Sequence, residues 1–302
     1  YQFKADLVNN TGLGSASGTV TLDGAVKNAS VDVRFNIVLG KVSGLKASAA
    51  GTTGLTLSWN KVTGAKAYVV EYTVKGKRVS KTVSSTSLAV TGLSAGTAYR
   101  FSVKAVSGSF SGAAATVSAS TKPAKVTGLK LKERTSNSVT LTWNKVSGAK
   151  KYEVQLLRNG KWVTVATTTK NSAVIGKKYI KANGKYSFRV RAVGAGGYGE
   201  YSAVLKVLSG LAKVTKLKAA KKTSSSVTLK WNKVSGAKRY EVWMSSGKRW
   251  VKVSAVKKNT ATIKKGLKKN TNYRFKVRAY KTVSKVNIYG DYSSVLKVRT
   301  GK

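Results

Sequence analysis

The sequence contains no cysteine and no histidine, and its 302 residues include only one proline and nine acidic residues. Without cysteine there are no disulfides and no thiolate nucleophiles, and without histidine there is no imidazole general base. The two absences together exclude zinc sites built from these side chains. No apolar run approaches the roughly 18 residues that a membrane-spanning helix needs. We therefore expect no metal site, no cofactor and no transmembrane segment.

Basic residues, in contrast, are abundant. The chain has 57 Lys and Arg against 9 Asp and Glu, which gives a formal net charge of +48. The excess grows along the chain: residues 1–40 have 3 basic and 3 acidic residues, residues 41–121 have 10 and 1, residues 122–209 have 18 and 3, and residues 210–302 have 26 and 2. A charge of this size favours contact with a polyanion, although net charge alone does not identify which one.

Three segments of the chain repeat the run Trp-Asn-Lys-Val-Thr/Ser-Gly-Ala-Lys-x-Tyr, which begins at Trp59, Trp143 and Trp231. Each run follows a Lys-Val-x-x-Leu-Lys opening. Each precedes a Tyr-x-Phe-x-Val-x-Ala segment, which begins at Tyr99, Tyr186 and Tyr273. The repeating unit is about 85 residues long, so it is a domain rather than a repeat of a solenoid.

Within the repeats, apolar and polar residues alternate at every second position. In the segment 139–143, for example, Val139, Leu141 and Trp143 share one face and the threonines share the other. This period predicts half-buried antiparallel strands and an all-β fold of stacked sheets. Tight hairpins are predicted at Lys75-Gly76, Asn159-Gly160 and Ser246-Gly247. The aromatic residues expected in the sheet interiors are Trp59, Trp143, Trp231, Tyr99, Tyr186 and Tyr273.

The Trp at the end of the second strand, the Tyr three strands later and the length of the unit resemble the fibronectin type III domain. The runs Tyr-Gly-Glu-Tyr-Ser at Tyr198 and Tyr-Gly-Asp-Tyr-Ser at Tyr289 are similar to those of secreted Gram-positive surface proteins. The first repeat departs from them, with Phe110-Ser111-Gly112-Ala113 in that place. The resemblance implies three tandem fibronectin type III-like β-sandwiches, preceded by a short β-rich N-terminal segment.

The expected domains are a β-rich leader or partial domain at residues 1–40 and repeats at residues 41–121, 125–208 and 213–300. The connections between the repeats are about five residues long, and one of them contains the only proline, Pro123. Short connections of this kind favour a semi-rigid rod.

The leader lacks the repeated motif. Strands are predicted at residues 1–7, 17–22 and 31–37, which are too few to close a sandwich alone. Two interpretations stay open. In one, the leader packs in cis on the first repeat or is the tail of an upstream domain; in the other, its strands complete a sheet in a second copy of the chain. The residues that would carry such assembly are Phe3, Leu7, Val31, Val33, Phe35 and Ile37.

The acidic residues do not form a recognisable catalytic set. One glutamate recurs on or beside the third strand of each repeat, where pairing with a neighbouring Lys or Arg is expected: Glu71, Glu153 and Glu241. Glu200 and Asp291 occupy the same turn of two repeats, which indicates a role in the turn. Since an enzyme needs an acid, a base, a nucleophile or a metal, we expect no catalytic residue and no enzymatic activity.

Basic residues mark the outward face of the Tyr-x-Phe strand. Because the aromatic and aliphatic residues of this strand alternate inward, their neighbours must point outward. These neighbours are Arg100, Lys104, Arg189, Arg191, Arg274, Lys276 and Arg278. They predict a basic stripe that contacts a polyanion, with a solvated surface that has no fixed partner as the alternative.

Three further tryptophans, Trp162, Trp243 and Trp250, lie outside the repeated run. Trp243 aligns outward beside the stripe, where stacking on Lys276 or Arg278 is expected. Flat aromatic rings suit sugar rings, so the three are candidate carbohydrate-binding or interface residues. Packing on their own or a neighbouring domain is the alternative.

These observations favour a non-catalytic structural or adhesive bacterial surface protein. Its rod of β-sandwiches would assemble into an extracellular layer, sheath or filament, or contact anionic wall polymers through its basic faces. The alternative is a spacer and polyanion-targeting module of a larger secreted hydrolase. The expected partners are other copies of the chain and anionic cell-wall or extracellular polymers, with nucleic acid bound only non-specifically. The expected location is extracellular, at the cell surface or in the cell wall.

Overall fold

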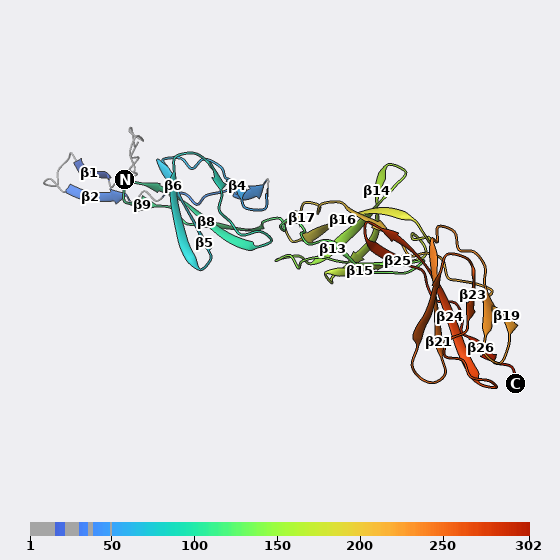
Figure 1. Cartoon of the computed structure of the whole chain (residues 1–302). Coiled ribbons are helices and arrows are strands. Elements are labelled where there is room, and N and C mark those ends of the chain that lie inside the picture. The colour runs from blue at the N-terminus through green and yellow to red at the C-terminus, as the bar shows by residue number, and fades with distance from the viewer. Residues whose placement is uncertain (1–15, 22–29, 36–38, 49) are drawn as a thin grey trace. The chain divides into compact units, whose positions relative to one another are not determined.

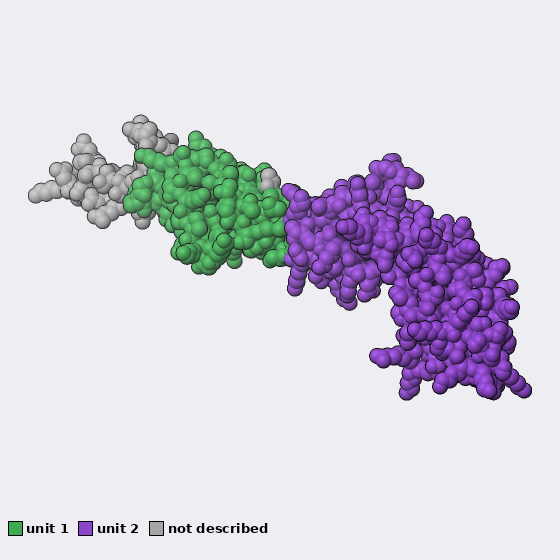
Figure 2. Space-filling model, in the orientation of Figure 1, with its two compact units in different colours: residues 1–124, 146–150, 193–199 green, residues 125–145, 151–192, 200–302 purple. Residues whose placement is uncertain are grey.

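The computed structural model describes residues 16–21, 30–35, 39–48 and 50–302. Every regular element in these described residues is a β-strand, which confirms the all-β fold class (Figure 1). The chain divides into two compact units (Figure 2). Unit 1 contains residues 1–124, 146–150 and 193–199, and unit 2 contains residues 125–145, 151–192 and 200–302.

The leader contains a two-stranded antiparallel sheet of β1 (Ala16–Thr21) and β2 (Ser30–Phe35). In this sheet Val31 pairs with Val20, and Phe35 pairs with Ala16. The strands predicted near residues 17–22 and 31–37 are therefore confirmed over their described parts. The strand predicted at residues 1–7, with Phe3 and Leu7, and the end of the last strand, with Ile37, lie outside the described residues.

Each repeat folds into two antiparallel sheets, one of three strands and one of five (Figure 1). In repeat 1 the smaller sheet has the order β3 (Lys46–Ser48), β4 (Leu55–Ser58), β7 (Ser87–Val90). The larger sheet has the order β10 (Ala115–Ser120), β8 (Ala98–Ser107), β5 (Ala67–Val74), β6 (Lys77–Val83), with β9 (Phe110–Ser111) also paired to β8.

Repeats 2 and 3 have the same order of strands in the smaller sheet, and the last paired hairpin strand is longer in repeat 3. In repeat 2 the smaller sheet has the order β11 (Lys130–Arg134), β12 (Val139–Thr142), β15 (Ser172–Ile175). The larger sheet has the order β14 (Lys161–Thr168), β13 (Lys151–Arg158), β16 (Lys185–Gly194), β17 (Gly197–Tyr198), with β18 (Leu205–Leu208) also paired to β16. In repeat 3 the smaller sheet has the order β19 (Lys218–Lys222), β20 (Val227–Lys230), β23 (Thr260–Ile263). The larger sheet has the order β22 (Val251–Val256), β21 (Arg239–Ser245), β24 (Asn272–Val283), β25 (Val286–Tyr289), with β26 (Leu296–Arg299) also paired to β24.

The core of each repeat is built around one Trp–Tyr pair. The tryptophans of the repeated run are 5%, 2% and 2% exposed at Trp59, Trp143 and Trp231. In each repeat the indole ring meets a tyrosine ring nearly edge-on, with 5.4 Å between the ring centroids. The indole N–H groups of all three tryptophans have no hydrogen-bond partner within the described residues. The prediction that these tryptophans lie in the sheet interiors is confirmed.

A second tyrosine of each repeat accepts a hydrogen bond from a backbone N–H five residues upstream. The N–H of Ser94 donates to Tyr99 at 2.7 Å, and the N–H of Lys268 donates to Tyr273 at 2.8 Å. Both rings are buried, as predicted. Tyr186 keeps the same bond but is only half-buried, so its predicted burial is wrong in degree. The hydroxyl explains why a tyrosine and not a phenylalanine stands at these positions.

Two of the three predicted tight hairpins are present. Lys75 and Gly76 both have positive φ angles (50° and 77°), as do Asn159 and Gly160 (48° and 74°), which is the two-residue turn that suits twisted strands. The tight turn predicted at Ser246-Gly247 is wrong, because β21 ends at Ser245 and β22 begins at Val251. The Ser245 hydroxyl donates to the carbonyl of Gly247 at 2.6 Å and holds the longer loop, which contains Trp250.

Candidate interaction surface

The predicted basic stripes lie on the central strands of the larger sheets, β8, β16 and β24. In β16, Phe188, Val190 and Ala192 are fully buried, so Arg189 and Arg191 point to the opposite face. The same alternation places the other predicted stripe residues outward. Arg100 is exposed, whereas six of them are half-buried: Lys104, Arg189, Arg191, Arg274, Lys276 and Arg278.

In repeat 2 the stripe is interleaved with aromatic rings. The guanidinium carbon of Arg189 lies 4.3 Å from the ring centroid of Trp162 and 3.7 Å from that of Tyr201. The guanidinium carbon of Arg191 lies 4.8 Å from the ring centroid of the same tyrosine. These distances are well within the roughly 6 Å over which a cation is attracted to an aromatic face. We call the series Trp162, Arg189, Tyr201 and Arg191 the ladder of repeat 2.

Repeat 3 has the corresponding ladder of Trp250, Lys276, Tyr292 and Arg278. The Lys276 ammonium lies 4.3 Å from the ring centroids of both Trp250 and Tyr292. Arg278 lies 4.8 Å from Tyr292 and 3.8 Å from Tyr289. The predicted stacking of Trp243 is present with Arg278, at 5.8 Å. Trp162, Trp243 and Trp250 thus all pack against cations of their own domain.

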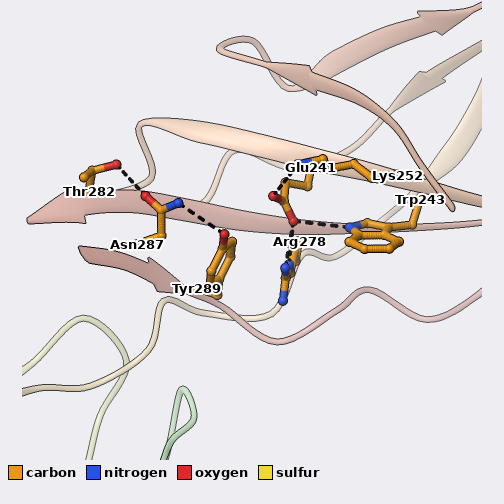
Figure 3. A network of polar contacts seen from close by, with 7 residues as sticks. All are labelled: Glu241, Trp243, Lys252, Arg278, Thr282, Asn287 and Tyr289. Atoms are coloured by element: carbon orange, nitrogen blue, oxygen red, sulfur yellow. Dashed lines mark hydrogen bonds and ion pairs between the residues drawn. The ribbon is translucent and has the colours of Figure 1, made fainter. Parts of the chain in front are cut away.

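One glutamate pairs with an arginine of each ladder. Arg191 donates to Glu153 at 2.7 Å in repeat 2, and Arg278 donates to Glu241 at 2.8 Å in repeat 3. Glu241 also accepts from the Trp243 indole N–H at 3.3 Å and lies 3.5 Å from the Lys252 ammonium (Figure 3). The expected pairing of these glutamates with basic neighbours is confirmed.

Burial and charge shift the pKa values of Lys276 in the repeat 3 ladder and of Glu241 beside it. Burial alone raises the pKa of Glu241, but the hydrogen bond and charge of Arg278, with Trp243 and Lys252, outweigh burial and lower this pKa below its ordinary value. Burial first, and then the charge of Arg278, lower the pKa of Lys276. These contacts therefore stabilise the ionised form of Glu241, whereas burial and the neighbouring Arg278 destabilise the charged form of Lys276.

Repeat 1 has a different arrangement on this face. Its glutamate, Glu71, pairs with Arg78 of the neighbouring strand β6 at 2.8 Å, and the Arg78 side chain is 74% exposed. The position that corresponds to Arg189 is Ser102, and the turn carries no tyrosine. The ladder is therefore a feature of repeats 2 and 3.

The tyrosines of the ladders were not predicted as site residues. Tyr201 and Tyr292 lie outside the strands, so the two-residue period says nothing about their direction. The available signal was the repeated run Tyr-Gly-acid-Tyr-Ser, whose second tyrosine is the ladder residue in both repeats. Asp291, the acid of that run in repeat 3, accepts a hydrogen bond from the hydroxyl of Ser136 in repeat 2, so this bond joins two repeats and does not bear on the predicted role in the turn.

The described residues contain no group of three or more His, Cys, Asp or Glu side chains that could hold a metal ion. Across the same residues, no helix is long and apolar enough to span a membrane. The larger sheets of repeats 2 and 3 present fixed positive charge and aromatic rings on this face.

Comparison with known families identifies the domains. The family model described as "Fibronectin type III domain" matches residues 40–121, 124–207 and 212–294. The chain thus consists of tandem all-β domains, and it belongs to the fibronectin type III family. Such domains are typical of extracellular proteins.

Two curated relatives show the kinds of protein in which similar repeats occur. The chain is 29% identical to Receptor-type tyrosine-protein phosphatase eta of Gallus gallus over 280 residues, which cover 85% of this chain and 19% of the relative. It is 30% identical to Chitinase A1 of Niallia circulans over 158 residues, which cover 47% of this chain and 22% of the relative. The chain spans about a fifth of the length of these two relatives.

Among solved structures, the chain is similar to the FN1-FN3 domains of chicken CNTN1, with 19% identity, a TM-score of 0.39, and coverage of 88% of this chain and 100% of that one. It is also similar to a segment of two fibronectin type III domains from chicken tenascin, with 23% identity, a TM-score of 0.39, and coverage of 56% and 99%.

Proposed function

We propose that this chain is a non-catalytic extracellular spacer and attachment segment of a bacterial surface or secreted protein. Its repeats would separate whatever lies at their two ends, and their basic surface would attach them to anionic cell-wall polymers. The short connections between repeats support the spacer role, because they favour a rod over a flexible string. The relative named Chitinase A1 supports a place beside the catalytic part of a secreted hydrolase as the alternative context.

The observation that carries the proposal is the charge balance of repeat 3. Residues 210–302 contain 26 Lys and Arg but only two acidic residues, Glu241 and Asp291. Both of these acids are already engaged, Glu241 by Arg278 and Asp291 by Ser136. Most cations of this repeat therefore lack a carboxylate partner in their own domain, and a polyanion would supply the missing charge.

Binding to purified Gram-positive cell walls tests this proposal. We expect the full chain to co-sediment with the walls, and we expect extraction of their anionic polymers to abolish co-sedimentation. Since surface charges are screened by salt, the affinity should fall at least about tenfold between about 0.05 and about 0.5 M NaCl. If neither added salt nor removal of the anionic polymers lowers the affinity for the walls, the electrostatic attachment is contradicted.

Assembly through the leader is a separate prediction. The described part of the leader is a two-stranded sheet, and such sheets are marginally stable without a further partner strand. If the leader pairs with a second copy of the chain, the full chain should elute from size-exclusion as a concentration-dependent oligomer, and a chain that begins at Lys41 should elute as a monomer. Two monomeric profiles would leave the leader to pack in cis.

A further inference from the structure

The three-stranded sheet of repeat 3 has an outward face of lysines and threonines. Lys218 of β19 lies directly opposite Lys230 of β20, and in the next outward row Lys221 lies opposite Thr228. Leu229, between these rows, is fully buried, so the lysines point away from the core. Like charges directly opposite each other in an antiparallel pair destabilise the sheet. The fold therefore does not benefit from the pair of Lys218 and Lys230.

The strands β19 and β26, which are orange and red in Figure 1, line a groove that includes Lys221 of this face. The groove has a volume of about 410 Å³. Half of its lining residues are cations, namely Lys221, Lys222, Lys297 and Arg299, and the rest are alanine, leucine and valine. It has no acidic residue in its lining, so an anion that entered would meet only positive charge.

Six cations thus gather on the sheet face and in the groove, and we call them the basic sheet of repeat 3: Lys218, Lys221, Lys222, Lys230, Lys297 and Arg299. All six are exposed. None of them takes part in the ion pairs found among the described residues, which involve Glu71, Glu153 and Glu241 only. The ladder cations, in contrast, are half-buried against rings and carboxylates. The basic sheet is therefore a part of repeat 3 in which exposed cations outside these ion pairs line a groove.

The equivalent sheets of the other repeats form without these lysines. At the position of Lys230, repeat 1 has Ser58 and repeat 2 has Thr142, each opposite one lysine. At the position of Lys221, repeat 2 has Glu133. The fold of the sheet thus does not require a basic residue at either position, which separates the lysines from the structural role of the strands.

The basic sheet also lacks aromatic side chains, on which nucleic-acid bases and sugar rings stack. The strands β19, β20 and β23 contain no aromatic residue, and the groove has none in its lining. Single-stranded nucleic acids and carbohydrates are commonly held by stacking on aromatic rings. Five of the six cations are lysines, which act on phosphate as point charges rather than through paired hydrogen bonds.

We infer that the basic sheet of repeat 3, and not the ladder, is the attachment site, and that it binds a linear polymer of phosphate groups through charge alone. This inference rests on the proposed attachment to anionic polymers. It adds which face of repeat 3 binds and that the bound groups are phosphates. The groove accommodates an extended chain, and the paired rows on β19 and β20 continue the positive charge beside it. Phosphate groups that lie between Lys218 and Lys230 would offset the repulsion of these two lysines in the free sheet.

Substitutions taken from repeat 2 test this inference in the full-length chain. The variant Lys221→Glu with Lys230→Thr gives the basic sheet the residues of its neighbour, so it should fold. We expect its affinity for long-chain inorganic polyphosphate, measured by isothermal titration calorimetry, to fall about tenfold because the net charge of the face falls by three. A control variant, Lys248→Glu with Lys257→Thr, loses the same charge at exposed loop positions and should change the affinity less than about threefold.

The outcomes separate the inference from the proposed function. If the full chain binds neither polyphosphate nor cell walls, both are overturned. If it binds but the sheet variant binds as tightly as the control variant, or if Lys276→Gln in the ladder weakens binding as much, only the assignment to the basic sheet is overturned. Tighter binding of a single-stranded oligonucleotide with the same number of phosphates would show that bases are read and would overturn recognition by charge alone.

Discussion

Replacing Trp231 by alanine should remove a large part of the folding free energy of repeat 3 and leave the stability of the other repeats unchanged. The indole is 2% exposed and packs edge-on against Tyr240, so alanine would leave a large cavity at the centre of the domain. Truncation of a buried tryptophan costs about 3–5 kcal/mol, and a domain of this size is stable by about 5–15 kcal/mol. Limited trypsin digestion measures the result directly, because an unfolded repeat 3 would expose its many Lys and Arg residues to cleavage.

Trp231→Phe is the informative comparison. Since the indole N–H has no hydrogen-bond partner in the described residues, phenylalanine breaks no bond and removes a buried polar group whose desolvation is unfavourable. We expect this variant to resist trypsin much longer than Trp231→Ala. Equal sensitivity of the two variants would mean that the N–H has a partner that contributes to stability. Resistance of the alanine variant equal to that of the unchanged chain would contradict the position of Trp231 in the core.

Replacing Glu241 by glutamine should destabilise repeat 3 by about 1.5–3 kcal/mol, the usual range for a hydrogen bond to a charged group. Glu241 is 5% exposed and holds Arg278, Trp243 and Lys252 together (Figure 3). Glutamine keeps the shape but loses the charge, which leaves Arg278 beside Lys276 with no compensating carboxylate. Hydrogen exchange of the backbone amides in β21 and β24 would report the loss for this repeat alone.

The equivalent substitution in repeat 1 is the matched control. Glu71 pairs with an exposed arginine, and surface pairs of this kind contribute at most about 1 kcal/mol. Glu71→Gln should therefore change the stability of repeat 1 very little. A similar loss for both substitutions would contradict the distinction between the ladder and an ordinary surface ion pair.

The effect of Glu241 should also depend on pH. Its pKa is lower in the folded than in the unfolded chain, so the ionised group stabilises the fold above its unfolded pKa. This contribution is lost as the pH falls through the folded-state pKa, where the carboxylate takes up a proton. The difference in stability between the unchanged chain and Glu241→Gln should thus be largest near neutral pH and shrink in acid.

The two-residue period predicted the strands and the sheet interiors well. In each repeat it placed the tryptophan of the repeated run on the buried face, because one face of each half-buried strand must be apolar. It was less informative at Tyr186, whose ring is half-buried although it makes the same hydroxyl bond as the buried Tyr99 and Tyr273. It also missed the longer loop after Ser245, because the Ser246-Gly247 pair lies inside a loop that the Ser245 hydroxyl holds and does not form a two-residue turn.

The ladder was only partly predictable. Alternation along β24 places Lys276 and Arg278 outward, and the same reasoning along β21 places Trp243 beside them. The period does not extend to Tyr292, which lies beyond the strands, nor does it show that Glu241 would be buried among the cations. A sequence shows which residues share a face, but the pairing of each cation with a ring or a carboxylate depends on the packing of side chains from separate strands.

The most direct measurement of how repeat 3 uses its charge is lysine acetylation of the full chain with and without polyphosphate, read by mass spectrometry. The account predicts that polyphosphate slows acetylation of Lys218, Lys221, Lys222, Lys230 and Lys297, and leaves Lys276 unchanged. Protection of Lys276 together with unchanged reactivity of Lys218 and Lys230 would contradict it, because the polymer would then lie on the ladder.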